Sequence, residues 1–151
     1  ASIDWVSIFL FAGMISVSSA MDKTGAGKLL AKFCVDLLGG TPSPLFVAAL
    51  LFLVSSFLTQ FMSNTATATL LCPIGVAIAQ QIGASPHAVV MSITIGIACA
   101  YATPVGTPPN TLVLGPGGYR FMDYVKVGTP LIFVSFIVSM IVIPIVWPFF
   151  K

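Results

Sequence analysis

The feature that most constrains the fold is a long uncharged run in the middle of the chain: no Asp, Glu, Lys or Arg occurs between Asp36 and Arg120. Hydrophobic residues make up 58% of the chain and charged residues 7%, with a mean hydropathy of +1.08, whereas soluble domains average about 25% charged residues. In water this run would expose large apolar patches. A bilayer accommodates it, because a membrane helix needs about 20 mostly apolar residues. We therefore predict an all-α integral membrane protein.

Two further uncharged stretches, residues 5–21 and 127–150, are each long enough to cross a bilayer. The first lacks the basic region and cleavage context of a signal peptide, so we interpret it as a transmembrane helix. We therefore expect a multi-pass protein of the cell membrane. The net charge of +2 is too small and too dispersed to favour nucleic acid as a partner.

Five segments follow along the chain. They are a transmembrane helix (1–22), an interfacial amphipathic arm (23–40), a re-entrant helical hairpin (41–84), a broken transmembrane helix (85–118), and an interfacial turn with a final transmembrane helix (119–151). Lysines alternate with apolar residues in the arm, which is typical of a helix lying at the membrane surface. Ser43-Pro44 and Ser85-Pro86 each supply an N-cap followed by Pro at the first helical position.

The hairpin is one of two structures that fit residues 44–83. The apolar runs on either side of Ser63, Asn64 and Thr65 are each shorter than a comfortable span. They form either two short spans joined by a polar turn outside the membrane, or a re-entrant hairpin whose tip lies at membrane depth. No charged or strongly loop-forming residue marks 60–66 as a solvated turn, so we favour the hairpin.

The second interruption is the stretch 103–118, TPVGTPPNTLVLGPGG, half of which is Pro or Gly. We expect the preceding helix to end at about Ala102, a short helical piece to run from Thr111 to Leu114, and the last span to cover 127–150. In hydrocarbon, irregular backbone is tolerated only where it is buried in protein or lines a wet cavity. Paired discontinuous helices indicate the binding site of a transporter.

The residues at the two interruptions are neutral oxygen donors. Freed carbonyls and hydroxyls suit sodium, while helix N-termini suit an anion. We expect Gly106 to let a carbonyl turn toward the cation, and Thr107 and Asn110 to face the anion. The four acidic residues are all Asp and lie outside the apolar core, so the carboxylate relay typical of proton-coupled carriers is missing from this sequence. Ser, Thr and Asn can also merely hold helices together, but their clustering in SNTATAT and TPVGTPPNT favours a site.

At these motifs the sequence resembles the divalent anion:sodium symporter (DASS) family. SNTATATLL is similar to the family's Ser-Asn-Thr hairpin motif, ATPVGTPPNTLVLGPGGYRFMDYVKVGTPL to its second-repeat signature, and TGAGKLLA to the region before the hairpin. The resemblance covers nearly the whole chain. It implies an inverted-repeat transporter with two hairpins, two sodium sites and a homodimeric assembly.

The resemblance also implies roles for individual residues. One sodium ion would be bound by Thr59, Asn64 and the backbone carbonyls of Met62 and Gly106. The substrate would be faced by Ser63, Asn64, Thr65, Thr107 and Pro108. Met62 is larger than the small residue expected before the motif, a change that a carbonyl ligand tolerates.

With one Ser-Asn-Thr motif, one hairpin and one broken helix, the chain corresponds to the second repeat alone. We expect it to be a fragment of a full transporter whose first-repeat half is missing; the alternative is two copies paired in opposite orientations. The predicted function is sodium-coupled symport of a divalent anion, either a di- or tricarboxylate or sulfate. The alternative is a passive anion channel or a membrane assembly module without sodium coupling. No nucleophile–base pair or metal cluster indicates an enzyme.

Overall fold

The structure is a computed structural model that describes Thr24 and residues 42–150. The predicted helix 1–22 and, apart from Thr24, the predicted arm 23–40 lie outside the described residues. The elements of residues 42–150 are all helices: α3 (Pro44–Leu58), α4 (Asn64–Gln81), α5 (Pro86–Ala98), α6 (Pro108–Leu114) and α7 (Phe121–Val146). Over this part of the chain the all-α prediction is confirmed.

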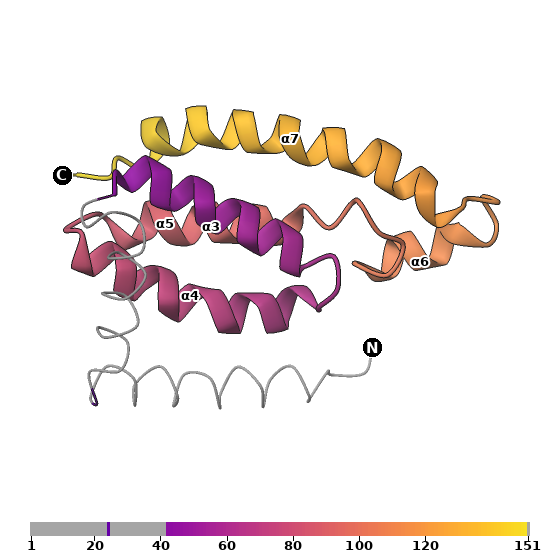
Figure 1. Cartoon of the computed structure of the whole chain (residues 1–151), viewed down its shortest axis with the longest axis horizontal. Coiled ribbons are helices and arrows are strands. Elements are labelled where there is room, and N and C mark those ends of the chain that lie inside the picture. Colours follow the sequence, from indigo (N-terminus) through magenta and orange to yellow (C-terminus); the bar gives the residue numbers. More distant parts are fainter. Residues whose placement is uncertain (1–23, 25–41, 151) are drawn as a thin grey trace.

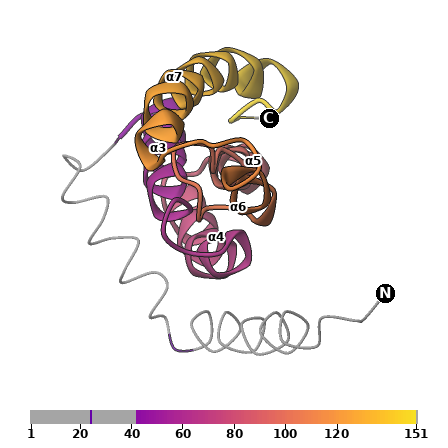
Figure 2. The same ribbon diagram turned by 90° about the vertical axis from the view of Figure 1, so that its right-hand side faces the viewer.

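The helices form one bundle in which α3 and α5 pack side by side and run in the same direction. α3 and α5 run one way, α4 and α7 run back, and α6 lies beyond the end of α5 (Figure 1). Viewed end-on, α7 and α4 lie on opposite sides of the bundle, with α3 and α5 between them (Figure 2). The core is built from apolar side chains of α3, α4 and α5, among them Val47, Leu51, Val89 and Ile93. This packing holds the two interruptions at the same end of the bundle.

Two close helix contacts depend on glycine. A Cβ at Gly75 of α4 would lie 3.3 Å from Val89 Cγ1 of α5, and closer still to the side chain of Ile93. A Cβ at Gly96 of α5 would overlap Ser55 Oγ and lie 2.7 Å from the Phe52 carbonyl oxygen. α5 therefore packs directly against the α3 backbone near the point where α5 ends.

The two predicted helix starts, Ser43-Pro44 and Ser85-Pro86, are confirmed. Ser43 is the N-cap of α3, and its Oγ accepts a hydrogen bond from the Phe46 N–H at 3.2 Å. Ser85 is the N-cap residue of α5 but makes no side-chain cap bond. Its backbone N–H donates to the Phe149 carbonyl at 2.7 Å instead, which joins the α4–α5 turn to the end of the chain that follows α7.

The boundaries at the second interruption differ from the predicted ones. α5 ends at Ala98 rather than about Ala102. The Ala102 N–H, which would bond to the Ala98 carbonyl in a longer helix, donates to Gln60 Oε1 instead. α6 begins at Pro108 rather than Thr111. Pro108 and Pro109 occupy its first two positions, where a helix has no use for their missing N–H groups. These prolines start a helix as well as ending the extended segment before it.

α7 is also displaced relative to the predicted last span. It begins at Phe121 and ends at Val146, so residues 121–126, predicted as part of an interfacial turn, form the start of the helix. The cause is a cap: the Arg120 N–H donates to Asp123 Oδ2 at 2.8 Å. Trp147 lies just beyond the helix end, where we had expected the helix to continue.

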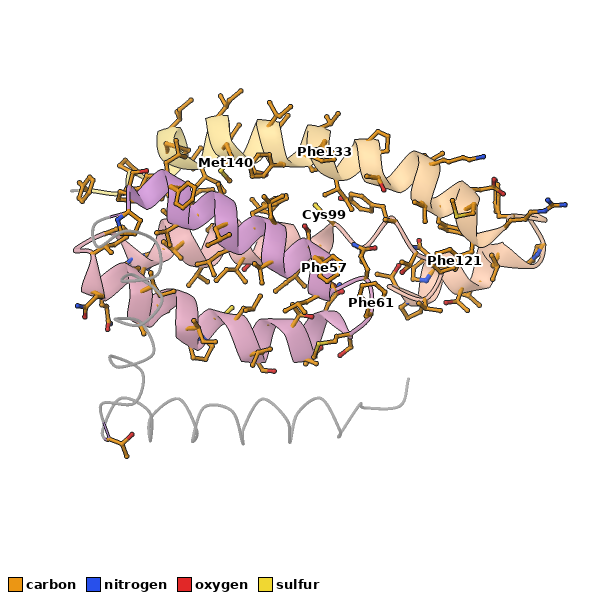
Figure 3. All side chains as sticks on the ribbon, in the orientation of Figure 1. Phe57, Phe61, Cys99, Phe121, Phe133 and Met140 are labelled. Atoms are coloured by element: carbon orange, nitrogen blue, oxygen red, sulfur yellow. The ribbon has the colours of Figure 1, made fainter. Side chains whose placement is uncertain are left out.

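Among the described residues, α7 is the helix that is long and apolar enough to cross a membrane, while α3 and α5 are apolar but shorter. The side of α7 that faces away from the bundle is covered with exposed apolar side chains, such as Phe133 (58% exposed), which Figure 3 labels. This surface is typical of a helix in contact with lipid or with another apolar helix.

Candidate functional site

The first part of the candidate site is the tip, which we define as residues 59–63 between α3 and α4. Thr59 is fully buried at the end of α3, and its Oγ1 donates to Asn64 Oδ1 at 2.6 Å. Ser63 is the N-cap of α4, with its Oγ accepting from the Ala66 N–H at 3.2 Å. Two predicted sodium ligands, Thr59 and Asn64, are therefore in direct contact across the tip.

The start of α4 leaves backbone donors free. Within the described part of the chain, no hydrogen bond uses the N–H groups of Asn64 or Thr65, whereas the next two, from Ala66 and Thr67, bond to Ser63. Asn64 is exposed and Thr65 is half-buried. Unpaired N–H groups at the positive end of an 18-residue helix are suited to an anion.

The second part is the break, which we define as residues 99–107 between α5 and α6. Apart from a long bond from Thr111 Oγ1 to the Thr107 carbonyl at 3.5 Å, four of its carbonyls accept hydrogen bonds from side chains. Asn110 Nδ2 donates to the carbonyls of Ala100 (2.9 Å) and Thr103 (3.0 Å), and Thr111 Oγ1 donates to that of Pro104 (2.7 Å). The fourth, that of Cys99, accepts from Gln60. Side chains of the tip and of α6 thus hold the break at four of its carbonyls.

These bonds correct the expected role of Asn110. Both hydrogens of its amide are used on backbone carbonyls, so the side chain has no donor left for an anion. Its own backbone carbonyl accepts from Tyr124 Oη of α7 at 2.8 Å. Asn110 therefore joins the break, α6 and α7, which is a structural role.

Gln60 is the residue at the site that sequence reasoning missed. It is 5% exposed and bonds the tip to the break. Its Oε1 accepts from the Ala102 N–H at 3.0 Å, and its backbone carbonyl accepts from Thr103 Oγ1 at 2.9 Å. A buried amide needs hydrogen-bond partners, so an amide in an apolar run was a sign that Gln60 bonds to another segment. The sequence does not show that these partners lie about forty positions away.

Gly106 lies beside this connection. A Cβ on Gly106 would meet Thr103 Oγ1 and the Ala100 carbonyl oxygen, each at 3.2 Å. Its own carbonyl, like that of Met62, accepts no hydrogen bond within the described part of the chain. The two backbone carbonyls predicted to bind sodium are thus both unpaired within the described part of the chain.

The other predicted substrate residues are at the start of α6. Thr107 is its N-cap residue and makes no side-chain cap bond, and Pro108 is exposed. No hydrogen bond in the described part of the chain joins either residue to Ser63, Asn64 or Thr65. The structure therefore connects tip and break through Gln60 rather than through the predicted substrate residues themselves.

α7 fixes the break from its other side. A Cβ at Gly128 would overlap the Tyr101 carbonyl oxygen and lie 2.6 Å from Ala102 Cα. Gly128 is one of the few buried residues of this helix. Figure 3 shows the same end of the molecule, with Phe57 and Phe61 of α3 and the tip, Cys99 where the break starts, and Phe121 at the start of α7.

The predicted sodium ligands fit that ion chemically. A hydroxyl, an amide oxygen and two backbone carbonyls are neutral hard oxygens, the donor type that alkali and alkaline-earth cations prefer. Groups of His, Cys, Asp and Glu that would suit a transition metal are absent from the described residues. The arrangement can hold a weakly bound monovalent cation beside a helix N-terminus that attracts an anion.

Comparison with known proteins shows which proteins this chain is similar to. A family model described as "Citrate transporter" (CitMHS) matches residues 1–150. The chain is 42% identical over 148 residues to a protein named Uncharacterized transporter YfbS from Escherichia coli K12, covering 98% of this chain and 24% of that protein. It is 41% identical over 128 residues to a protein named Uncharacterized transporter from Haemophilus influenzae, covering 83% and 27%.

A third relative carries a more specific name. The chain is 30% identical over 144 residues to the sodium-dependent dicarboxylate transporter SdcS of Staphylococcus aureus (strain USA300), covering 95% of this chain and 27% of that protein. The chain thus spans about a quarter of the length of the curated relatives it matches.

Proposed function

This chain belongs to the CitMHS citrate transporter family, and from that premise we propose that it is one half of the transport machinery of a sodium-coupled carrier for a divalent anion. The family and the relatives named above are transporters rather than enzymes. The observation that carries the proposal is the bond between buried Thr59 and Asn64 Oδ1, next to unpaired carbonyls and unpaired helix N–H groups.

Sodium is the proposed coupling ion. Thr59, Asn64 and the carbonyls of Met62 and Gly106 provide neutral oxygens. The described residues of the apolar core contain no acid, so a carboxylate-based proton relay has no donor there. The relative SdcS is named as sodium-dependent, which supports sodium as the ion.

The proposed substrate is a di- or tricarboxylate, with sulfate as the alternative divalent anion. The free N–H groups of Asn64 and Thr65 and the hydroxyl of Ser63 lie at the start of α4, where the helix dipole favours negative charge. Thr107 and Pro108 border the same end of the bundle from the α6 side. The names of the family and of SdcS favour a carboxylate.

We also propose that α3 and α4 form a re-entrant hairpin. α3 has 15 residues and is therefore about 22 Å long, which is shorter than the hydrocarbon core of about 30 Å. A helix of that length ends inside the membrane, and its partner α4 returns from the same depth. The tip then lies at membrane depth, where its unpaired groups need a cavity or a ligand.

The remainder of the carrier is proposed to come from a first-repeat half. The chain matches a quarter of its relatives' length, and its described residues contain one tip and one break, whereas inverted-repeat carriers build the site between two such units. The exposed apolar surface of α7 provides room for contact with that half, with lipid or with a second protomer of a homodimer.

The test is uptake of labelled succinate, citrate and sulfate into proteoliposomes that contain the complete protein carrying this sequence. Each anion is offered with and without an inward sodium gradient. Asn64→Ala runs beside the wild type, with Thr94→Ala, an exposed threonine of α5, as the matched control. We expect sodium-dependent uptake of one carboxylate, lost in Asn64→Ala and kept in the control.

Uptake that is indifferent to sodium would contradict the proposal and favour a passive anion channel. Sulfate uptake without carboxylate uptake would correct the substrate but keep the coupling. An Asn64→Ala protein as active as the wild type would show that the tip is not the site.

A further inference from the structure

We propose that Gln60 is a positioning residue that fixes the tip against the break and thereby sets the spacing of the oxygens that bind sodium. The sodium part of this inference rests on the function proposed above. The connection itself rests on hydrogen bonds alone. Gln60 is buried, and in the sequence it lies between two of the proposed ligands, Thr59 and Met62. Its side chain bonds to the break rather than to either of them.

The side-chain amide of Gln60 is used completely. Nε2 donates to the carbonyls of Ser56 at 2.7 Å and Cys99 at 2.9 Å, and Oε1 accepts from the Ala102 N–H at 3.0 Å. The Gln60 carbonyl adds a fourth bond by accepting from Thr103 Oγ1 at 2.9 Å. We call this set of four bonds the Gln60 bridge. Three of the four reach the break, across 39 to 43 positions of sequence.

Both ends of the Gln60 bridge adjoin proposed sodium ligands. On the tip side, Gln60 directly follows Thr59, whose hydroxyl is bonded to Asn64. On the break side, Thr103 Oγ1 is the atom that a Cβ on Gly106 would meet at 3.2 Å. A shift at either end therefore changes the distance between a hydroxyl or amide ligand from the tip and the Gly106 carbonyl from the break.

The hydrogen bonds of the Gln60 bridge lie among mostly apolar side chains, which strengthens them. Gln60, Ala102 and Thr103 border a cavity of about 400 Å³ whose other lining residues are mostly apolar, including Phe57, Phe61 and Phe121. Hydrogen bonds in such surroundings are stronger than in water, and their loss leaves polar groups without partners.

A purely structural role for Gln60 makes a different prediction from a positioning role. If the amide only satisfied the end of α5, its removal would lower stability and leave sodium affinity unchanged. If it positions the ligands, its removal loosens the break and also raises the sodium concentration that half-saturates transport. Two separate measurements distinguish these roles.

The first measurement is hydrogen exchange by mass spectrometry on the complete protein, comparing the wild type with Gln60→Met. Met has a similar length and no amide. The matched control is Gln80→Met, which removes an exposed amide on α4 of the same hairpin. We expect amides of the 99–107 peptide to exchange at least about tenfold faster in Gln60→Met, with no change in the control. Unchanged exchange in Gln60→Met would overturn the inference.

The second measurement is the sodium concentration for half-maximal anion uptake. We expect it to rise about tenfold in Gln60→Met, with a smaller change in maximal rate. Thr103→Val removes only the hydroxyl bond to the Gln60 carbonyl, and we expect it to raise the value about threefold. Thr103→Ser, which keeps the hydroxyl, should restore it. Thr103→Val also tests the bridge if Gln60→Met fails to fold.

The outcomes separate this inference from the proposed function. A wild type without sodium-dependent uptake contradicts the proposed function, while the exchange result still decides whether Gln60 holds the break. Faster exchange with an unchanged sodium requirement would overturn the positioning role and leave a structural one.

Discussion

The tip and the break are both short interruptions between helices, but side chains bond to more backbone carbonyls in the break than in the tip. At the break, the carbonyls of Cys99, Ala100, Thr103 and Pro104 all accept hydrogen bonds from side chains. At the tip, the Met62 carbonyl and the first N–H groups of α4 have no partner within the described part of the chain. Side chains therefore fix the break at these four carbonyls, while the start of α4 leaves its first N–H groups free.

The prolines at the break sharpen this contrast. Pro108 and Pro109 fill the first turn of α6, and the next two N–H groups, those of Asn110 and Thr111, bond to the Thr107 carbonyl. The start of α6 therefore has few donors for an anion, whereas the start of α4 has two. Of the two helix starts, the one at the tip has more free N–H groups for the proposed anion, and the proposed contribution of the break is the Gly106 carbonyl.

The largest expected effect is at the break. Asn110→Ala removes the donor from two carbonyls at once, and we expect it to lower the free energy of unfolding by about 3 kcal/mol. Asn64→Ala, the corresponding change at the exposed start of α4, should lower it by less than about 1 kcal/mol. Denaturation of both variants in detergent measures the difference. Equal losses would break the distinction between a fixed break and an open tip.

A second prediction concerns the contact of α7 with the break. We expect Gly128→Ala to lower the free energy of unfolding by about 2 kcal/mol, because the new methyl group overlaps the Tyr101 carbonyl. Gly115→Ala is the control, since a Cβ there has nothing within 4 Å, and its effect should stay within about 0.5 kcal/mol. A stable Gly128→Ala protein would show that α7 does not fix the break.

The third prediction concerns function at the tip. Thr59→Val keeps the shape of a fully buried side chain and removes the hydroxyl bonded to Asn64. We expect the sodium concentration for half-maximal uptake to rise about tenfold, equivalent to about 1.4 kcal/mol. Thr94→Val on the exposed side of α5 should leave it unchanged. Equal sodium requirements in the two variants would remove Thr59 from the site.

The smallest predicted effect compares the two N-caps. Ser63 makes a side-chain cap bond at the start of α4, and Thr107 makes none at the start of α6. Ser63→Ala should therefore lower the free energy of unfolding by about 1 kcal/mol, and Thr107→Ala by a few tenths. Thermal unfolding of the two variants shows which one loses more stability. A larger loss of stability in Thr107→Ala than in Ser63→Ala would contradict the prediction.

Local signals in the sequence predicted much of the fold. Ser43-Pro44 marks the start of α3 and Ser85-Pro86 the start of α5, because these helix-start signals depend on neighbouring residues only. The end of α5 could not be predicted to the residue, since it depends on Gln60 Oε1 accepting the Ala102 N–H from 42 positions away. The start of α7 was misplaced because Asp123, in a polar stretch, caps a helix rather than forming a turn.

The same limit applies to the site. The resemblance to the DASS family supplied the ligand residues, and the family is confirmed, but their roles stay predictions. Reasoning from residue types assigned Asn110 to the anion, because an exposed amide and a structural amide look the same in a sequence. Gln60 was missed for the opposite reason: a single amide at the end of an apolar run gives no sign of where its partners lie.

The most direct test of the account is equilibrium binding of labelled sodium to the complete purified protein, comparing the wild type with Asn64→Ala. The account predicts that the variant loses the sodium ion held by Thr59, Asn64 and the two unpaired carbonyls, so that saturable binding falls in amount or weakens at least about tenfold. Sodium binding to Asn64→Ala with the affinity and amount of the wild type would contradict a sodium site at the tip.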